Sequence, residues 1–295
     1  EARYIWLILS ILFGFFAYLS RARRWTLLIF PLGHKPSFRN TFYAVMTGYL
    51  ANMALPRIGE ITKCVALGKK ENIPIDRLLG TVVIERTIDF LSLMIIMIIM
   101  LFIEGDVLGP FLRDNVWLPL QSRLSEVFGF AWIFWILIVV TGLVSMYLVW
   151  RLRKALRKIR FFAKVFDTLW GITHGLKTIL AIRHKWEFVF HTVFIWVNYI
   201  LMTWVVVFAI ESTSHLTLAD GIFLLVIGGI AMTAPVQSGL GVFHFIISRG
   251  LLVIYGINLT DGLVYAILAH ESQLIFGALL GIYSFYAIMK KKERQ

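Results

Sequence analysis

Long apolar runs separated by short polar links dominate this 295-residue sequence. They restrict its possible folds more than any other feature. A helix needs about 20 apolar residues to cross the hydrocarbon core of a bilayer. The runs that are long enough, once their flanks are counted, are Tyr4–Leu19, Leu78–Ile103, Phe128–Trp150, Phe188–Ile210 and Leu263–Met289. Only 16% of the residues are charged, against about a quarter in soluble domains. The sequence therefore predicts an all-α polytopic membrane protein with about five full transmembrane helices.

Lysine and arginine gather at particular links and so set an expected orientation. Cytoplasmic loops of membrane proteins collect Lys and Arg. Basic clusters stand at Arg21–Arg24, at Lys63 with Lys69–Lys70, at Arg151–Arg160 and at Lys290–Lys292. The links at 211–220 and 256–262 contain no Lys or Arg. We therefore expect a multi-pass protein of the cytoplasmic (inner) membrane, with the basic links and the C-terminus in the cytoplasm.

The excess of positive charge has a simple interpretation. The chain carries a net charge of +12. Basic residues beside transmembrane helices contact anionic phospholipid headgroups, and much of the stretch Arg151–Lys185 is expected to lie on the membrane as an amphipathic helix. We therefore expect membrane phospholipids, anionic ones above all, as partners, and no nucleic acid. The single cysteine, Cys64, excludes an internal disulfide framework and a cysteine-cluster metal site.

Two further apolar segments are interrupted by proline and glycine. Segments Phe38–Gly68 and Thr217–Tyr255 each begin and end on one side of the membrane if the five spans are right. Each segment is long enough to enter the membrane and turn back. Irregular backbone survives at membrane depth only where it is buried in protein or lines a polar cavity. The sequence predicts two re-entrant helical hairpins, whose breaks contain Pro56, Gly59, Pro235, Gly239 and Gly241.

The two broken segments resemble each other. GYLANMALPRIGE at 48–60 parallels GGIAMTAPVQSGLG at 228–241, and each is followed by a half-helix, a polar link and a long helix with charged residues. Because the hairpins enter from opposite faces, the two halves are expected to be related by inversion, as in many transporters. We expect one transmembrane domain, 1–295, with inverted repeats at 1–103 and 186–289 and a connecting segment at 104–185.

Three charged residues within five positions form the first candidate site. Glu85 lies about halfway along its span, at a depth of roughly 16 Å, and Arg86 and Asp89 follow it closely. An uncompensated ion there costs at least about 2.5 to 3.5 kcal/mol, so these residues need partners. The first break offers Arg57 and Glu60. Two interpretations stay open: a charged cavity that receives a polar headgroup, or an ion-pair network that only locks hairpin to helix.

A second polar group is expected at the other break. Gln237 and Ser238 belong to the loop, His244 to the following half-helix, and His270 and Glu271 to the last long helix at a similar depth. His244 and Glu271 form a candidate polar pair. HExxH and helical His-x3-His spacings are missing, so we expect no metal site. A general acid–base pair stays open, but no nucleophile or cofactor motif accompanies it, so we expect no cofactor and no enzymatic activity.

Several of these motifs together resemble the lysylphosphatidylglycerol synthase transmembrane region family. The motifs are RW at 24–25, GYLANMALPRIGE, ERTIDF at 85–90, PVQSGLGVFHF at 235–245 and HE at 270–271. The family contains flippase-like integral membrane proteins and the membrane domain of the bacterial multiple peptide resistance factor. The residues that match its pattern position by position are Pro56, Arg57, Gly59, Glu60, Glu85, Arg86, Asp89, Pro235, Gly239 and Gly241.

The resemblance implies lipid handling in a bacterial or archaeal membrane. It is compatible with a homodimer and with one more helix before Glu1. Two departures bear on the substrate: His244 stands where many relatives have an acid, and Ser238 where many have glycine. The chain has no soluble aminoacyl-transferase domain, so lysyl transfer is not implied.

Three classes of function follow from these observations. The first is a flippase-like protein that moves a phospholipid or a lipid-linked headgroup between leaflets through a polar midplane cavity. The second is a secondary transporter of a small solute or ion, which a closed vestibule would favour, whereas a lateral opening would favour a lipid. The third is an enzyme or a non-catalytic accessory subunit of lipid or glycan modification. We expect the first.

Overall fold

A computed structural model describes residues 3–103, 105–119, 121–122, 136–137, 140–142, 144, 151, 184–233 and 236–290. Every secondary-structure element in these residues is helical. The long helices are α1 (Tyr4–Ile29), α4 (Ile75–Ile103), α9 (Lys185–Val205) and α12 (Leu259–Met289). The shorter ones are α2 (Phe38–Ala54), α3 (Gly59–Glu71), α5 (Gly105–Leu112), α10 (Leu218–Ala231) and α11 (Val242–Tyr255). Single turns connect them at Phe30–Leu32, Arg113–Trp117, Val206–Ala209, Glu211–Thr213 and Gln237–Gly239.

Five helices of the described chain are long and apolar enough to cross a membrane. Four of them, α1, α4, α9 and α12, coincide with predicted spans. The fifth, Gln237–Tyr255, lies in the second broken segment, where the sequence predicted a half-helix. The predicted span Phe128–Trp150 and the basic segment Arg151–Lys185 lie almost wholly outside the described residues. The prediction of an all-α polytopic membrane protein is confirmed.

Helix α1 is longer than its apolar run, and its length corrects the prediction that the span ends at Arg21–Arg24. The sequence placed Arg21–Arg24 in the cytoplasm, after the end of the span. Instead, α1 continues to Ile29, and Arg21 and Arg24 are buried. Their burial is tolerated because the carboxylates of α4 lie at the same level of the bundle and neutralise them.

The first hairpin breaks at Pro56 because proline restricts the residue before it. Leu55 has φ −140° and ψ 132°, an extended conformation that ends α2. Arg57 then adopts φ 62°, so the chain turns back and α3 starts at Gly59. A Cβ atom at Gly59 would lie 2.1 Å from the carbonyl oxygen of Gly48, so glycine is required where the two helices cross. The side chain of Asn52 secures the crossing by accepting the N–H of Gly59 at 2.7 Å.

The second hairpin breaks over a longer stretch. A capping box between Thr217 and Asp220 starts α10, which ends at Ala231. Between Gln237 and Gly241 the backbone is left-handed at three positions: Ser238, Gly239 and Gly241. Gly239 and Gly241 thus serve as the sequence predicted, by allowing the chain to turn before α11. Pro235 lies outside the described residues.

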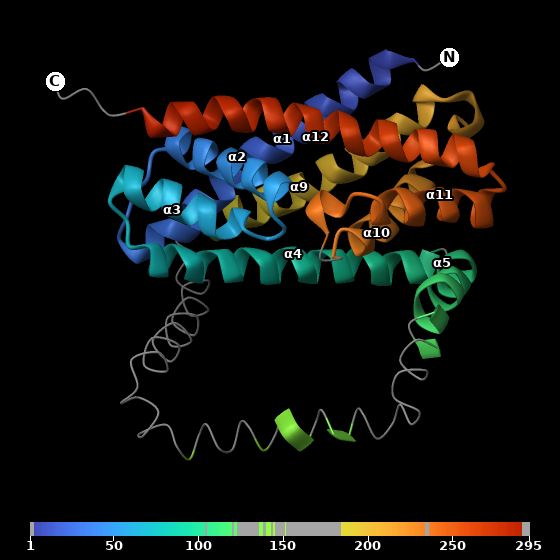
Figure 1. Cartoon of the computed structure of the whole chain (residues 1–295), viewed down its shortest axis with the longest axis horizontal. Helices are drawn as coiled ribbons and strands as arrows, with labels where there is room; N and C mark the ends of the chain where they lie inside the picture. The colour runs from blue at the N-terminus through green and yellow to red at the C-terminus, as the bar shows by residue number, and fades with distance from the viewer. Residues whose placement is uncertain are drawn as a thin grey trace.

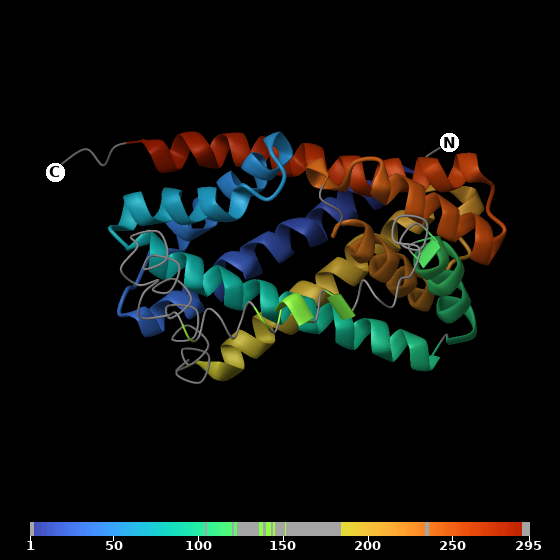
Figure 2. The ribbon, with the colours of Figure 1, turned by 60° about the horizontal axis from the view of Figure 1, so that its bottom comes forward.

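The long helices hold the two hairpins between them. Figure 1 shows α12 and α4 on opposite sides, with α2–α3 and α10–α11 between them and reaching inward from opposite ends, so that their tips meet near the middle. After a turn of the view, α1 and α9 run obliquely to α4 and α12 (Figure 2), and they pack against each other. The apolar core has one part around α2 and α3 and another around α10 and α11. Both helix–break–helix hairpins are therefore present, whereas their re-entry into a membrane and the inverted repeat stay predictions.

Candidate functional site

The two hairpin tips touch each other directly. The guanidinium of Arg57 donates a hydrogen bond from Nη2 to the carbonyl oxygen of Thr233, at 2.9 Å. In the other direction, the amide Nε2 of Gln237 donates to the carbonyl oxygen of Ala54, at 3.0 Å. Both acceptors are backbone groups freed where a helix ends. Each tip therefore satisfies part of the broken backbone of the other.

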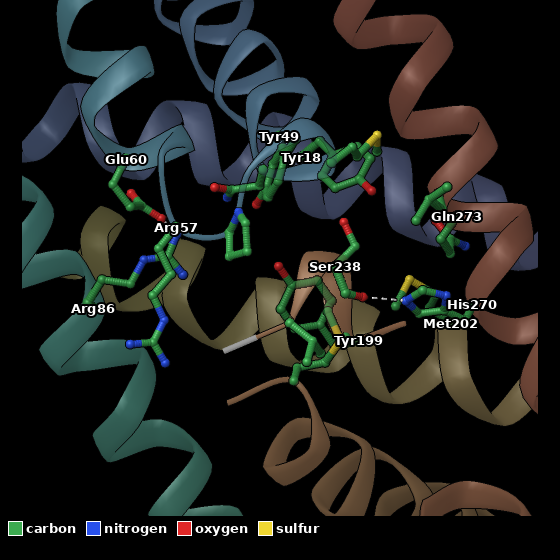
Figure 3. A pocket seen from close by; sticks show the side chains of 17 residues that line it. Tyr18, Tyr49, Arg57, Glu60, Arg86, Tyr199, Met202, Ser238, His270 and Gln273 are labelled. Carbon is green, nitrogen blue, oxygen red and sulfur yellow. Dashed lines mark hydrogen bonds and ion pairs between the residues drawn. The ribbon is translucent and has the colours of Figure 1, made fainter. Parts of the chain in front are cut away.

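A cavity of about 600 Å³ lies where the tips meet. Helices α1, α2, α3, α4, α9 and α12 and both breaks contribute to its wall. Figure 3 shows Arg57, Arg86 and Glu60 on one side of it, His270 and Gln273 on the other, and tyrosines among them. The remainder of the wall is largely apolar. The full set of lining residues is Tyr18, Tyr49, Asn52, Met53, Pro56, Arg57, Glu60, Arg86, Tyr199, Met202, Met232, Val236, Ser238, Gly239, His270, Gln273 and Leu274.

Behind the cationic side of the cavity lies a dense set of ion pairs, here called the ion-pair cluster. Glu85 is 2% exposed and lies 3.0 Å from Nη2 of Arg21 and 2.7 Å from Nζ of Lys63. Asp89 accepts hydrogen bonds from Arg21 and Arg24, each at 2.6 Å. Residues from α1, α3 and α4 thus form the cluster: Arg21, Arg24, Glu60, Lys63, Glu85, Arg86 and Asp89.

The sequence predicted Arg57 and Glu60 as partners of the charged residues of α4, and the structure confirms only Glu60 in this role. Glu60 pairs with Arg86, as expected from the first break. Arg57, by contrast, makes no ion pair with Glu85 or Asp89 among the pairs that the described residues form, because its guanidinium points toward the second hairpin. Sequence reasoning gave the role of partner to Arg57 because it belongs to the first break, whereas the basic residues of α1 that take this role had been assigned to the cytoplasm.

Lys63 was also taken for a cytoplasmic residue, and it too is buried. Its ammonium bridges Glu60 at 3.0 Å and Glu85 at 2.7 Å, and it lies 4.9 Å from the ring centroid of Trp25. Because α3 folds back from the tip, Lys63 comes one turn after Glu60 on the helix face that meets α4. A carboxylate three positions before a lysine is the signal that could have identified this role.

The charge around the cavity is positive. The ion-pair cluster has four cations and three carboxylates, and Arg57 adds a further cation. The Arg86 side chain is 46% exposed, and Arg57 is exposed as well. The N-termini of α3 and α11 begin at the two tips and add partial positive charge. This side of the cavity is therefore suited to an anionic group.

The second predicted group also comes together. Oε1 of Glu271 lies 3.3 Å from Nε2 of His244 and 3.0 Å from Nδ1 of His270. The other ring nitrogen of His270, Nε2, lies 2.8 Å from the carbonyl oxygen of Ser238. His244, His270 and Glu271 thus converge at the edge of the cavity, and of the three only His270 lines it.

The cavity separates the predicted residues into those that line it and those that support it. The lining ones are Pro56, Arg57, Glu60, Arg86, Ser238, Gly239 and His270. Glu85 and Asp89 lie behind them in the ion-pair cluster, and Gln237 is used in the contact between the tips. Sequence reasoning missed Tyr18, Tyr49, Tyr199 and Gln273. Gln273 follows His270 by three positions on α12, and this helical spacing was the available signal.

Comparisons with known proteins agree with the motifs. No curated protein and no solved structure matches the chain. A family model described as "Lysylphosphatidylglycerol synthase TM region" matches residues 1–281, which is nearly the whole chain. The matched region contains both hairpins, the ion-pair cluster and most of α12. The chain therefore belongs to the lysylphosphatidylglycerol synthase transmembrane region family.

Proposed function

We propose that this protein moves a phospholipid or a lipid-linked headgroup between membrane leaflets through the cavity at the hairpin tips. Membership in the family relates the chain to lipid modification or transport in a membrane. The observation that carries the proposal is the cavity itself. It joins a cationic side, formed by Arg57 and Arg86, to a largely apolar wall within one space of about 600 Å³. A polar headgroup attached to apolar chains needs both surfaces at once.

The opening of the cavity favours a lipid over a small solute. Arg57, Met232 and Val236 line the cavity and are exposed in the described part of the chain. Nearby Leu55 and Leu240, at the two tips, are 54% and 57% exposed. Apolar side chains around an open site suit contact with acyl chains that stay in the bilayer. An enclosed vestibule would suit the alternative, a transporter of a soluble ion or metabolite.

Charge favours an anionic group in the cavity. In this proposal Arg57 and Arg86 contact the phosphate of the headgroup, with the N-termini of α3 and α11 beside them. Arg86 is held in place by Glu60, whereas Arg57 makes only a backbone contact among the described residues. Arg57 can therefore exchange the carbonyl of Thr233 for a phosphate at a cost of about one hydrogen bond.

The two tips are the proposed gates. Their contacts, Arg57 with Thr233 and Gln237 with Ala54, close the space between the hairpins. A transporter must expose its site to each side in turn, so these contacts have to break and re-form in each cycle.

The basic groove of about 1130 Å³ among Arg39, Lys69, Lys70 and Lys290 would mark the cytoplasmic end. We further propose a bacterial or archaeal inner membrane, no enzymatic activity, no nucleic-acid partner and, from the family, a homodimer.

The proposal is tested by leaflet exchange of a fluorescent phosphatidylglycerol in liposomes that contain the purified protein. We expect exchange with the wild type and at least a tenfold slower rate with Arg57→Ala, since a contact between a charged group and phosphate is worth about 1.5 to 3 kcal/mol. The matched control is Arg249→Ala, because Arg249 is an exposed arginine in α11 that does not line the cavity. It should exchange lipid at the wild-type rate.

Three results would count against the proposal. Wild-type liposomes that exchange no phospholipid, anionic or zwitterionic, would favour the solute transporter or the accessory subunit. Equal exchange in Arg57→Ala and wild type would remove Arg57 from the site. Equal loss in Arg57→Ala and Arg249→Ala would mean that the effect does not come from the cavity.

A further inference from the structure

The cluster of His244, His270 and Glu271 has features that the proposed function does not use. Its residues come from the first turn of α11 and the middle of α12, which the fold brings together behind the second tip. The side chains of His244 and His270 are 12% and 9% exposed, and that of Glu271 is 31% exposed. Their ligand atoms lie within 4.8 Å of one another.

The hydrogen bonds of His270 leave one contact unexplained. Its Nε2 lies 2.8 Å from the carbonyl oxygen of Ser238, a pure acceptor, so Nε2 carries a proton (Figure 3). In a neutral ring, Nδ1 then bears a lone pair, and this lone pair faces Oε1 of Glu271 at 3.0 Å. Two lone pairs do not attract each other at that distance. A metal ion bound by both atoms would replace this repulsion with two bonds.

A third donor converges on the same place. Nε2 of His244 lies 3.3 Å from the same oxygen of Glu271, and the two imidazole rings are 5.2 Å apart at 75°. Because Nδ1 of His244 accepts the N–H of Gly241, its Nε2 carries a proton and in the metal-free site donates to the same carboxylate. Tetrahedral zinc with bonds of about 2.0 to 2.1 Å places its ligand atoms about 3.3 Å apart. The two separations from Glu271, 3.3 and 3.0 Å, are close to that value, and all three ligand atoms lie within 4.8 Å of one another.

The surroundings also suit a metal. Histidines that bind metals usually donate their other N–H to a carbonyl or carboxylate, and His270 does so toward Ser238. Ring packing by Phe243, at 5.0 Å from His270, fixes the ring further. Binding through Nε2 of His244 moves its proton to Nδ1, so only the long contact from the N–H of Gly241, at 3.4 Å, is given up.

We propose that His244, His270 and Glu271 bind one divalent transition-metal ion of the zinc class, with the fourth coordination position directed to water or to a ligand oxygen. Two imidazoles and one carboxylate favour zinc or its neighbours over Mg²⁺, which prefers oxygen ligands. The ion would fasten the start of α11 to α12. This inference is independent of whether the cavity transports lipid.

The test titrates the purified full chain in detergent with Co²⁺ alone after removal of metal by a chelator. We expect one Co²⁺ per chain, the visible absorption of four-coordinate cobalt, and its displacement by Zn²⁺ but not by Mg²⁺. Glu271→Gln and His244→Ala should each weaken binding by more than the roughly 10–100-fold that follows loss of an outer-shell partner. X-ray absorption of the zinc-loaded wild type should count two imidazoles and needs no variant to fold.

The matched control is His191→Ala, which removes a histidine that also neighbours a glutamate, 4.0 Å away on α9. It should bind Co²⁺ like the wild type. Wild-type protein without stoichiometric Co²⁺ or Zn²⁺ would overturn the inference. Undiminished binding in folded Glu271→Gln and His244→Ala would overturn it as well, because the metal would then be bound elsewhere.

Discussion

The two hairpins meet at one cavity, but different chemistry holds each of them. The tip of α2–α3 is held by the ion-pair cluster, in which the side chains of Glu85 and Lys63 are 2% and 6% exposed. The tip of α10–α11 is held by the more exposed group of His244, His270 and Glu271, with Glu271 at 31%, and by its hydrogen bonds to the first tip. Its break also contains three left-handed residues, against one in the first break. We infer that the first hairpin is the more firmly held of the two gates and the second the more easily displaced.

The test of this comparison with the largest expected effect on stability removes one carboxylate from each region. Glu85→Gln leaves Lys63 and Arg21 buried without their main counter-ion. Breaking such a buried pair typically costs about 3 to 5 kcal/mol. Glu271→Gln, made in chelator-treated protein, removes a partly exposed partner and should cost less than about 1 kcal/mol. Unfolding of both variants in detergent, followed by circular dichroism, gives the two values.

The contrast between the hairpins fails if the two substitutions shift the unfolding temperature equally. A small effect of Glu85→Gln would mean that the ion-pair cluster contributes little to holding α3 against α4. A large effect of Glu271→Gln without metal would mean that the second tip is held as firmly as the first.

A smaller effect is expected from Gly59→Ala, which tests how closely the two helices of the first hairpin, α2 and α3, are packed. A Cβ atom there would lie 2.1 Å from a carbonyl oxygen of α2 and 2.6 Å from the side chain of Asn52. Backbone has to move, and overpacking of this kind costs about 1 to 3 kcal/mol. Thermal unfolding should show the loss.

Gly109→Ala is the matched control, since a Cβ at Gly109 meets nothing within 4 Å in the described structure. It lies inside helix α5, where alanine is favoured over glycine by about 1 kcal/mol. Its stability should stay equal or rise. If Gly59→Ala were as stable as the wild type, the close crossing of α2 and α3 would be incorrect.

Most of the fold could be predicted from sequence because apolar length and helix breakers are local signals. Four spans, both breaks, and the roles of Gly239 and Gly241 follow from them. The residues at which the spans end were harder to predict from the sequence. In the sequence, Arg21 and Arg24 resemble the cytoplasmic end of a span. In the structure, carboxylates of α4 lie at the same level and pair with them. A charge pattern along the chain does not show which charges meet across helices.

The candidate site was predictable in its charged half and much less so in its aromatic half. Glu85, Arg86 and Asp89 stand out because charge inside an apolar run is costly. Tyr18, Tyr49 and Tyr199 do not stand out, because tyrosine is common in membrane helices and each comes from a different helix. The pair of His244 and Glu271 was predictable, because the second broken segment and the last long helix were expected to bring their polar residues to a similar depth.

The central claim is that the two tips separate to let a headgroup pass, and cross-linking tests it most directly. Ala54 and Gln237 lie on opposite tips and share a hydrogen bond, while the native Cys64 is buried. A variant with Ala54→Cys and Gln237→Cys, joined by a short reducible linker, should lose leaflet exchange of fluorescent phosphatidylglycerol and regain it after reduction. Each single-cysteine variant should keep exchange when treated in the same way. Undiminished exchange in fully cross-linked protein would contradict the account, because the headgroup would then cross without separation of the tips.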